Sequence, residues 1–138
     1  MTIPHKNKTF TTFIAAVTGG IGLHRFYMHG RKDIVGWLHA ATLPVSALAI
    51  LIFSNSQPLF MGMLFVLSVL CGFLEALVIG LTPDEKWDAR HNPASGKKSE
   101  SHWVLALILV LTLGVGAMSV IALLARSFDL LFTGGAYG

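Results

Sequence analysis

Four ionisable side chains lie inside otherwise apolar stretches of this sequence, and their types and spacing could support chemistry. Glu75 lies six residues before the end of one apolar stretch, and His39 lies five residues into another. His24 and Arg25 close a third stretch. A charge in hydrocarbon costs at least about 2.5 kcal/mol, so such residues are rare and have a defined role. A carboxylate beside an arginine and two histidines can form ion pairs, exchange protons or bind a cation.

The stretches that carry these residues have the length of membrane-spanning helices. Hydrophobic residues make up 54% of the 138-residue chain and charged residues 12%, about half the charged fraction of a soluble domain. Apolar blocks of roughly twenty residues cross a hydrocarbon core of about 30 Å as helices. We therefore predict an all-α integral membrane protein with a four-helix transmembrane bundle, which excludes a soluble enzyme, a disordered chain and an outer-membrane barrel. The predicted spans cover residues 9–27, 34–53, 59–81 and 103–125.

Polar segments connect and follow these spans. A short connector, residues 28–33, makes the first two spans an antiparallel hairpin. After the third span we predict a short interfacial helix over residues 83–90, with Thr82 as its N-cap and Glu85 completing a capping box. Residues 93–102 are predicted to form a flexible linker. Residues 126–138 are predicted to form a tail that lies in the interface or frays.

The predicted hairpin brings the four ionisable residues to one depth. At the helical rise, Glu75 lies about 9 Å and His39 about 7 Å below the same membrane surface, and His24 and Arg25 lie at that level. We expect these four residues to form an intramembrane polar cluster. Three interpretations remain open: the cluster fixes how the helices pack, it binds a headgroup, ion or proton, or His24, His39 and Glu75 hold a metal. The last lacks the i, i+4 ligand spacing of a zinc motif, so we predict no metal and no cofactor.

Small residues recur at every fourth position of the third predicted span. They are Ser68, Gly72, Ala76 and Gly80. Such a stripe lets two helix backbones approach closely. We therefore predict a packing face beside Glu75.

The distribution of basic residues predicts an orientation. With four spans, seven Lys and Arg residues lie on the side of the 28–33 and 82–102 loops, and three lie on the other side. The positive-inside rule puts these loops in the cytoplasm and both termini outside. Within the loops, a basic surface for lipid headgroups or a partner is predicted at Arg31, Lys32, Lys97 and Lys98.

Several motifs resemble the TM-two (two-transmembrane-helix) domain family. They are Lys6-Asn7-Lys8, the run from Gly19 to Tyr27, Gly36-Trp37, and Glu75 followed by the run from Thr82 to Asn92. The matching family-motif positions are Gly19, Gly20, Gly22, His24, Arg25, Phe26, Tyr27, Asp84, Trp87 and Asn92. The resemblance covers residues 6–92 and implies a membrane hairpin of bacterial type in the inner membrane, without an established biochemical activity. The chain departs from the family in having room for additional crossings.

These observations favour a non-enzymatic membrane scaffold or interaction protein. No nucleophile–base pair suited to catalysis is visible, and no Lys/Arg run suits nucleic acid. The expected partners are membrane lipids, another membrane protein or a second copy of the chain. The alternative is an oligomeric transporter or channel subunit that uses Glu75 and His39 to handle protons or cations.

Overall fold

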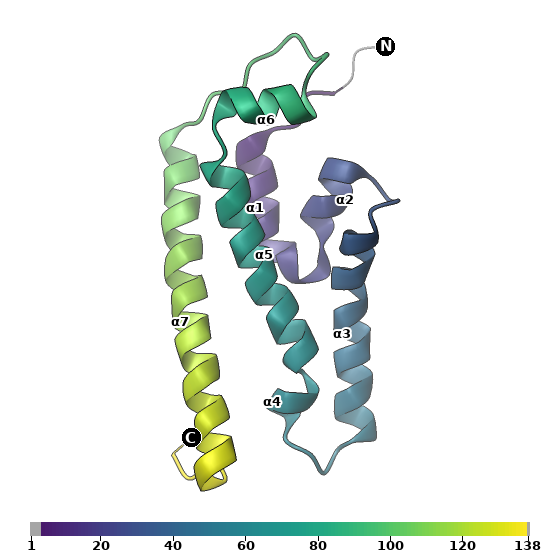
Figure 1. Cartoon of the computed structure of the whole chain (residues 1–138), viewed down its shortest axis with the longest axis vertical. Helices are drawn as coiled ribbons and strands as arrows, with labels where there is room; N and C mark the ends of the chain where they lie inside the picture. Colours follow the sequence, from purple (N-terminus) through teal and green to yellow (C-terminus); the bar gives the residue numbers. More distant parts are fainter. Residues whose placement is uncertain (1–3, 138) are drawn as a thin grey trace.

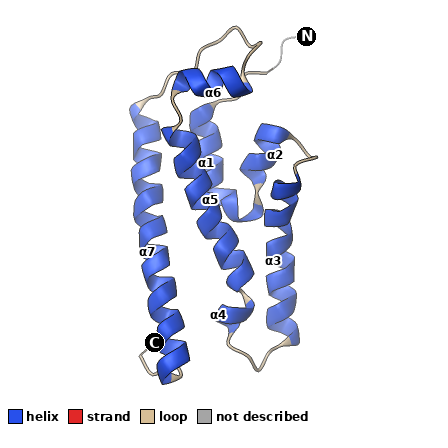
Figure 2. Ribbon diagram, in the orientation of Figure 1, coloured by secondary structure: helices blue, strands red, loops and turns tan. Residues whose placement is uncertain are grey.

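The computed structural model describes residues 4–137, and over that range the regular structure is helical throughout (Figures 1 and 2). Three helices, α3, α5 and α7, are long and apolar enough to cross a membrane. They run lengthwise through the molecule, and α6 lies across one end (Figure 1). In chain order the elements are α1 (Lys8–Thr18), η1 (Gly19–Ile21), α2 (Leu23–His29), α3 (Ile34–Ile52), α4 (Pro58–Met61), α5 (Met63–Leu81), α6 (Asp84–His91) and α7 (Trp103–Thr133).

The single span predicted over residues 9–27 is wrong, because the chain reverses in its middle. α1 ends at Thr18, the short η1 turn follows, and α2 runs back toward the end where α1 begins (Figure 1). Gly22 adopts a left-handed conformation, with φ of 74°, and its N–H donates to the Gly19 carbonyl oxygen at 3.0 Å. A Cβ at Gly22 would also lie 2.8 Å from the Gly36 carbonyl oxygen. The reversal therefore requires glycine here.

The predicted packing face of α5 is confirmed, since Ser68, Gly72, Ala76 and Gly80 are all buried. At Gly72 the partner is the turn between α1 and α2. A Cβ built on Gly72 would lie 2.6 Å from the Gly19 Cα, so the two backbones touch. Close backbone approach of this kind requires small residues on both sides.

The second predicted span matches α3 to within one residue, but the third is interrupted. Gly62 separates the single turn of α4 from α5. At the start of α5 the Phe65 N–H is shared between two acceptors. It donates to the Gly62 carbonyl oxygen at 3.1 Å and, across the interface, to the Ser46 hydroxyl oxygen of α3 at 3.1 Å.

The fourth predicted helix continues to Thr133, through most of the predicted tail. Arg126 and Asp129, one turn apart, form an ion pair with an N–O distance of 2.6 Å. Gly134, with φ of 69°, then ends the helix in a left-handed conformation. Side-chain pairing and a glycine cap continue the helix into residues for which the sequence predicts a tail that lies in the interface or frays.

The helix α6 lies one residue later than predicted, and Thr82 does not cap it. The Thr82 hydroxyl instead donates back to the Val78 carbonyl oxygen at 2.7 Å, so the predicted capping box does not form. The linker after α6 is also held in place rather than free. The N–H groups of Ser99 and Ser101 donate to the carboxylates of Asp88 and Asp84 at 2.6 and 2.8 Å.

The reversal between α1 and α2 changes where the chain ends lie. The N-terminal segment lies beside α6, whereas α7 ends at the opposite end of the molecule (Figure 1). The four-span prediction put both termini on the same side. Within the described residues, three helices rather than the predicted four are long and apolar enough to cross a membrane, and the N-terminal segment and the end of α7 lie at opposite ends of the molecule.

Candidate functional site

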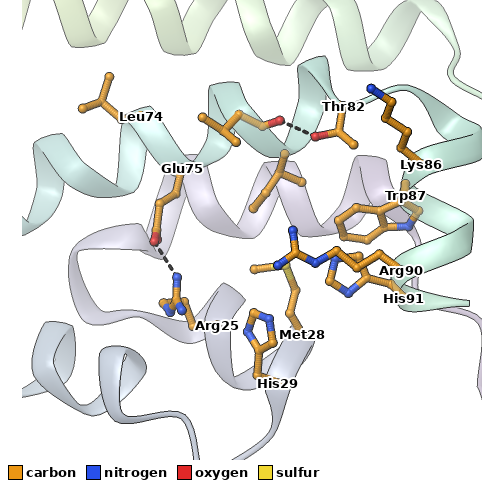
Figure 3. A pocket seen from close by; sticks show the side chains of 12 residues that line it. Arg25, Met28, His29, Leu74, Glu75, Thr82, Lys86, Trp87, Arg90 and His91 are labelled. Carbon is orange, nitrogen blue, oxygen red and sulfur yellow. Dashed lines mark hydrogen bonds and ion pairs between the residues drawn. The ribbon is translucent and has the colours of Figure 1, made fainter.

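The four residues of the predicted polar cluster meet around the Glu75 carboxylate. Arg25 donates from Nη1 to Glu75 Oε1 at 2.7 Å (Figure 3). His24 contacts the other carboxylate oxygen through Nε2, and His39 Nε2 lies 3.9 Å from that same oxygen. His24 is fully buried, whereas the Glu75 side chain keeps 27% of its surface exposed. The carboxylate is therefore held by one arginine and two histidines.

Polar contacts continue from this cluster toward the α6 end of the molecule. Asp33 Oδ2 lies 3.2 Å from Arg25 Nε and 3.0 Å from His29 Nδ1. The same side chain caps α3, accepting the N–H groups of Val35 and Gly36 at 2.8 and 3.2 Å. Burial by itself raises the pKa of Asp33, but these hydrogen bonds and the Arg25 charge outweigh burial and lower the pKa. Sequence analysis missed Asp33, although an Asp directly before an apolar run is a helix-cap signal.

Polar contacts also continue from the cluster toward the middle of α5. His39 Nδ1 lies 2.7 Å from Ser68 Oγ, and Ser68 Oγ donates to the Gly20 carbonyl oxygen at 2.7 Å. A hydroxyl has a single proton, so Ser68 accepts from His39 Nδ1–H while it donates to Gly20. Ser68, predicted only as a packing residue, thus ties the cluster to the backbone of the α1–α2 turn. The sequence gives no signal for this second role.

A second set of contacts, which we call the α6 latch, joins α6 to the N-terminal segment. The Asn92 side chain pairs with the Lys6 backbone, accepting its N–H at 2.7 Å and donating to its carbonyl oxygen at 3.1 Å. Trp87 Nε1 donates to the same carbonyl oxygen at 3.0 Å. Lys8 is buried, donates to the Thr82 carbonyl oxygen at 2.8 Å and forms an ion pair with Asp84. The latch fixes α6 across the end of α1 and α5.

The predicted basic surface lies at the α6 end in two separate segments. Arg31 and Lys32 are exposed in the connector before α3, and Lys97 and Lys98 are exposed in the linker after α6. They lie outside the polar cluster. Within residues 4–137, no group of three or more His, Cys, Asp or Glu side chains is arranged to hold a metal ion.

Several residues of the motifs that resemble the TM-two domain family contact one another in the structure. Phe26 packs edge-on against Trp37 with ring centroids 5.3 Å apart, and its ring lies over Gly36. The Asn7 N–H donates to the Tyr27 hydroxyl at 3.4 Å. No family model, no curated protein and no solved structure matches the chain.

Proposed function

We propose that the chain is a multi-pass protein of the inner (plasma) membrane in which α3, α5 and α7 cross the bilayer. The α1–α2 segment enters as a re-entrant hairpin and returns. Non-helical backbone at membrane depth is tolerated where the protein itself satisfies its polar groups. The hydrogen bond from Ser68 to the Gly20 carbonyl oxygen supports this arrangement.

The observation that carries the proposal is the distribution of basic residues in this topology. Arg126 lies near the far end of α7. The other nine of the ten Lys and Arg residues lie at the α6 end, at positions Lys6, Lys8, Arg25, Arg31, Lys32, Lys86, Arg90, Lys97 and Lys98. The positive-inside rule then places the α6 end and the N-terminal segment in the cytoplasm and the end of α7 outside. Counted with a full first span, the same residues divide seven to three between the two sides, which is a weaker asymmetry.

The function that this arrangement supports best is a non-enzymatic interaction role at the cytoplasmic membrane surface. The exposed residues Arg31, Lys32, Lys97 and Lys98 would attract anionic lipid headgroups, at about 1 kcal/mol for each basic residue near the surface. The polar cluster and the α6 latch would hold the hairpin beneath this surface. We further propose membership of the TM-two domain family, of bacterial type, supported by the contacts that Lys6 and Asp84 make in the latch.

Cysteine accessibility tests the topology. In a Cys71→Ser background, which removes the chain's one cysteine, single cysteines replace Lys98, Gln57 or Tyr137. A membrane-impermeant maleimide should label positions 57 and 137 in intact cells, and position 98 only after permeabilisation. Labelling of position 98 from outside, with position 137 protected, would reject the proposed orientation.

Lipid selectivity tests the interaction role. Spin-labelled phosphatidylglycerol should be enriched around the reconstituted protein relative to phosphatidylcholine. Glutamine at Arg31, Lys32, Lys97 and Lys98 should remove most of this preference, whereas Arg126→Gln at the other end should leave it unchanged. Equal selectivity in both variants would contradict the role of the basic surface.

The alternative, transport by an oligomer, has weaker structural support. Within the described residues, the series of polar contacts from Asp33 through Glu75 and His39 ends at the Gly20 carbonyl oxygen, beside the middle of α5. Proton or cation flux in proteoliposomes that is lost in Glu75→Gln, with stability retained, would favour transport instead.

A further inference from the structure

A cavity of about 350 Å³ lies between α2, α5 and α6, beside the polar cluster (Figure 3). Its wall toward α6 is basic, with Lys86 and Arg90 on α6 and Arg25 and His29 on α2. The lining on α5 includes the apolar side chains of Leu74 and Val78 on one side and the Glu75 carboxylate beside Arg25. In Figure 3 the Arg90 side chain extends into the space toward Arg25 and Met28, and Lys86 stands near Thr82 at the rim. The cavity is thus basic at one end and apolar along one side.

The basic wall carries charge that the protein does not neutralise. Arg25 and His29 have carboxylate partners, Glu75 and Asp33. Within residues 4–137, by contrast, neither Lys86 nor Arg90 has a carboxylate within the 4.0 Å of an ion pair. The Glu75 carboxylate, the acidic group in the cavity wall, is already paired with Arg25 and His24. The cavity therefore favours an anion at its α6 end.

His91, which also lines the cavity, lies in the same positive electrostatic potential. Burial lowers the pKa of His91, and the nearby charges of Lys6, His29 and Arg90 lower it further. A histidine surrounded by cations gains protons less readily, whereas a bound anion gains from the same field.

The apolar wall extends the cavity away from the charged end. Leu74 and Val78 lie one turn apart on the same face of α5. They are 62% and 67% exposed, although both are large apolar side chains. In the proposed topology this face meets the acyl chains of the cytoplasmic leaflet, and the basic wall lies toward the headgroups. An occupant that matches both walls has an anionic head and an apolar tail.

We propose that this cavity binds one anionic glycerophospholipid, with its phosphate between Arg90 and Lys86 and an acyl chain along Leu74 and Val78. The inference rests on the proposed membrane topology, and it names a single stoichiometric site distinct from the diffuse basic surface at Lys97 and Lys98. The planar guanidinium of Arg90 can donate two parallel hydrogen bonds to phosphate oxygens, and Lys86 adds a point charge at the rim.

Native mass spectrometry of the detergent-purified chain tests the site. Titration with phosphatidylglycerol should give one tightly bound lipid per chain, and phosphatidylcholine should bind more weakly. The Lys86→Gln, Arg90→Gln double variant should lower the affinity for phosphatidylglycerol about tenfold, as expected when charge-assisted hydrogen bonds are lost. The matched control, Lys97→Gln with Lys98→Gln, removes the same charge from exposed positions and should retain wild-type affinity. Equal loss in both double variants, or no loss in the first, would overturn the proposal.

Two further measurements keep the outcome unambiguous. Both Lys86 and Arg90 are exposed, so their variants should unfold at the wild-type temperature without lipid. Arg90→Lys keeps the charge but loses the planar fork, and its affinity should fall between wild type and Arg90→Gln. Wild-type affinity in both single variants at Arg90 would reject the role assigned to its guanidinium.

The source of the anion is tested by competition. Inorganic phosphate in excess should neither displace phosphatidylglycerol nor raise the unfolding temperature to the same extent, because it cannot use the apolar wall. If it does both, the site binds a free anion and the lipid assignment fails. Binding in detergent is measured independently of the maleimide labelling, so failure of the proposed topology and failure of this site are distinguishable.

Discussion

The hairpin unit, which comprises α1 to α6, and the long helix α7 are held by different kinds of interaction. α7 has 31 residues, yet its buried residues are Leu105 and Thr112. Its hydroxyl groups bond within the helix, as Thr112 does to the Ile108 carbonyl oxygen at 2.7 Å. In the hairpin unit, side chains reach across elements to backbone atoms, as Ser68 does to Gly20 and Trp87 does to Lys6. α7 is therefore stabilised mainly by hydrogen bonds within its own helix, whereas the hairpin unit is stabilised by hydrogen bonds between its elements.

The difference follows from the backbone that each region contains. A regular helix satisfies its internal N–H and C=O groups by itself, so α7 needs only close packing, such as that of Leu109 on Gly80. The α1–α2 reversal and the start of α5 interrupt the helical ladder of hydrogen bonds. Serines of neighbouring helices bind the backbone at both places: Ser68 donates to the Gly20 carbonyl oxygen, and Ser46 accepts from the Phe65 N–H, which also donates to the Gly62 carbonyl oxygen. Polar residues in this protein therefore gather where the helices are interrupted.

The largest expected difference between the two regions is at glycine. Gly72→Leu places a side chain where the Gly19 backbone lies, and overpacking of this kind should lower the free energy of unfolding by about 3 kcal/mol or more. The matched control is Gly114→Leu in α7, where an added Cβ meets nothing within 4 Å. It should change the free energy of unfolding by no more than about 1 kcal/mol. Denaturant titration in mixed micelles measures both, and equal losses would remove the distinction between the regions.

The next largest effect is expected at the ion pairs. Glu75→Gln leaves Arg25 and the buried His24 without their carboxylate and should cost about 2 kcal/mol or more. In α7, Arg126→Gln removes a local pair between residues one turn apart and should cost less than about 1 kcal/mol.

A double-mutant cycle sharpens this comparison. Glu75→Gln and Arg25→Gln should couple by about 1 kcal/mol or more if the pair fixes the hairpin. Single variants as stable as wild type, with no coupling, would show that the charges are kept for a ligand or for protons.

A smaller effect is expected at the tryptophans. Trp87→Phe removes the hydrogen bond to the Lys6 carbonyl oxygen and should cost about 1 kcal/mol. Trp103→Phe at the start of α7, where the side chain is 75% exposed, should stay within about 0.5 kcal/mol of wild type. Thermal unfolding followed by circular dichroism distinguishes the two, and a larger loss at Trp103 would contradict the α6 latch.

The smallest effect is a pH dependence confined to the linker. Burial by itself raises the pKa of Asp88, but hydrogen bonds from Asn92 and Ser99 outweigh burial and lower the pKa from 3.8 to about 2. Stability from this carboxylate is therefore complete above pH 3.8 and is lost as the pH falls toward 2. Hydrogen-exchange protection of the Ser99 amide should fall in that window, while amides in the middle of α7 stay protected. Asp88→Asn should remove the pH dependence, and its persistence there would exclude this cause.

The polar cluster could be predicted because ionisable residues are rare in apolar stretches. The predicted common depth of Glu75 and Arg25 assumes a continuous span over residues 9–27, which the structure replaces by a reversal, yet the two side chains do meet. Arg25 lies close to the connector before α3 in either topology, and this connector stays at the α6 end whether the preceding segment crosses or returns. The short sequence distance from Arg25 to the connector thus determines the membrane depth of Arg25, whether the preceding segment crosses the membrane or reverses.

The reversal itself could not be predicted from hydropathy. The residues from Gly19 to Gly22 are compatible with a bend in one continuous helix, and the full reversal depends on close contacts with residues distant in sequence, Gly72 on α5 and Gly36 on α3. The α6 latch escaped prediction for a similar reason, because the atoms that Trp87 and Asn92 bind belong to the Lys6 backbone. Every residue has a backbone carbonyl oxygen, so no sequence pattern indicates which one will accept a hydrogen bond.

The order of synthesis gives the reversal a further consequence. Three of the groups that hold the α1–α2 hairpin, Ser68, Gly72 and Glu75, belong to α5, and the contact from His24 to Glu75 spans 51 residues. At about 5–20 residues per second, the ribosome adds those residues over roughly 3–10 seconds after His24. During this interval the hairpin lacks both the Glu75 carboxylate and the Ser68 hydroxyl that donates to the Gly20 carbonyl oxygen. The α1–α2 hairpin is therefore fixed only after α5, which follows it in the chain, has been made.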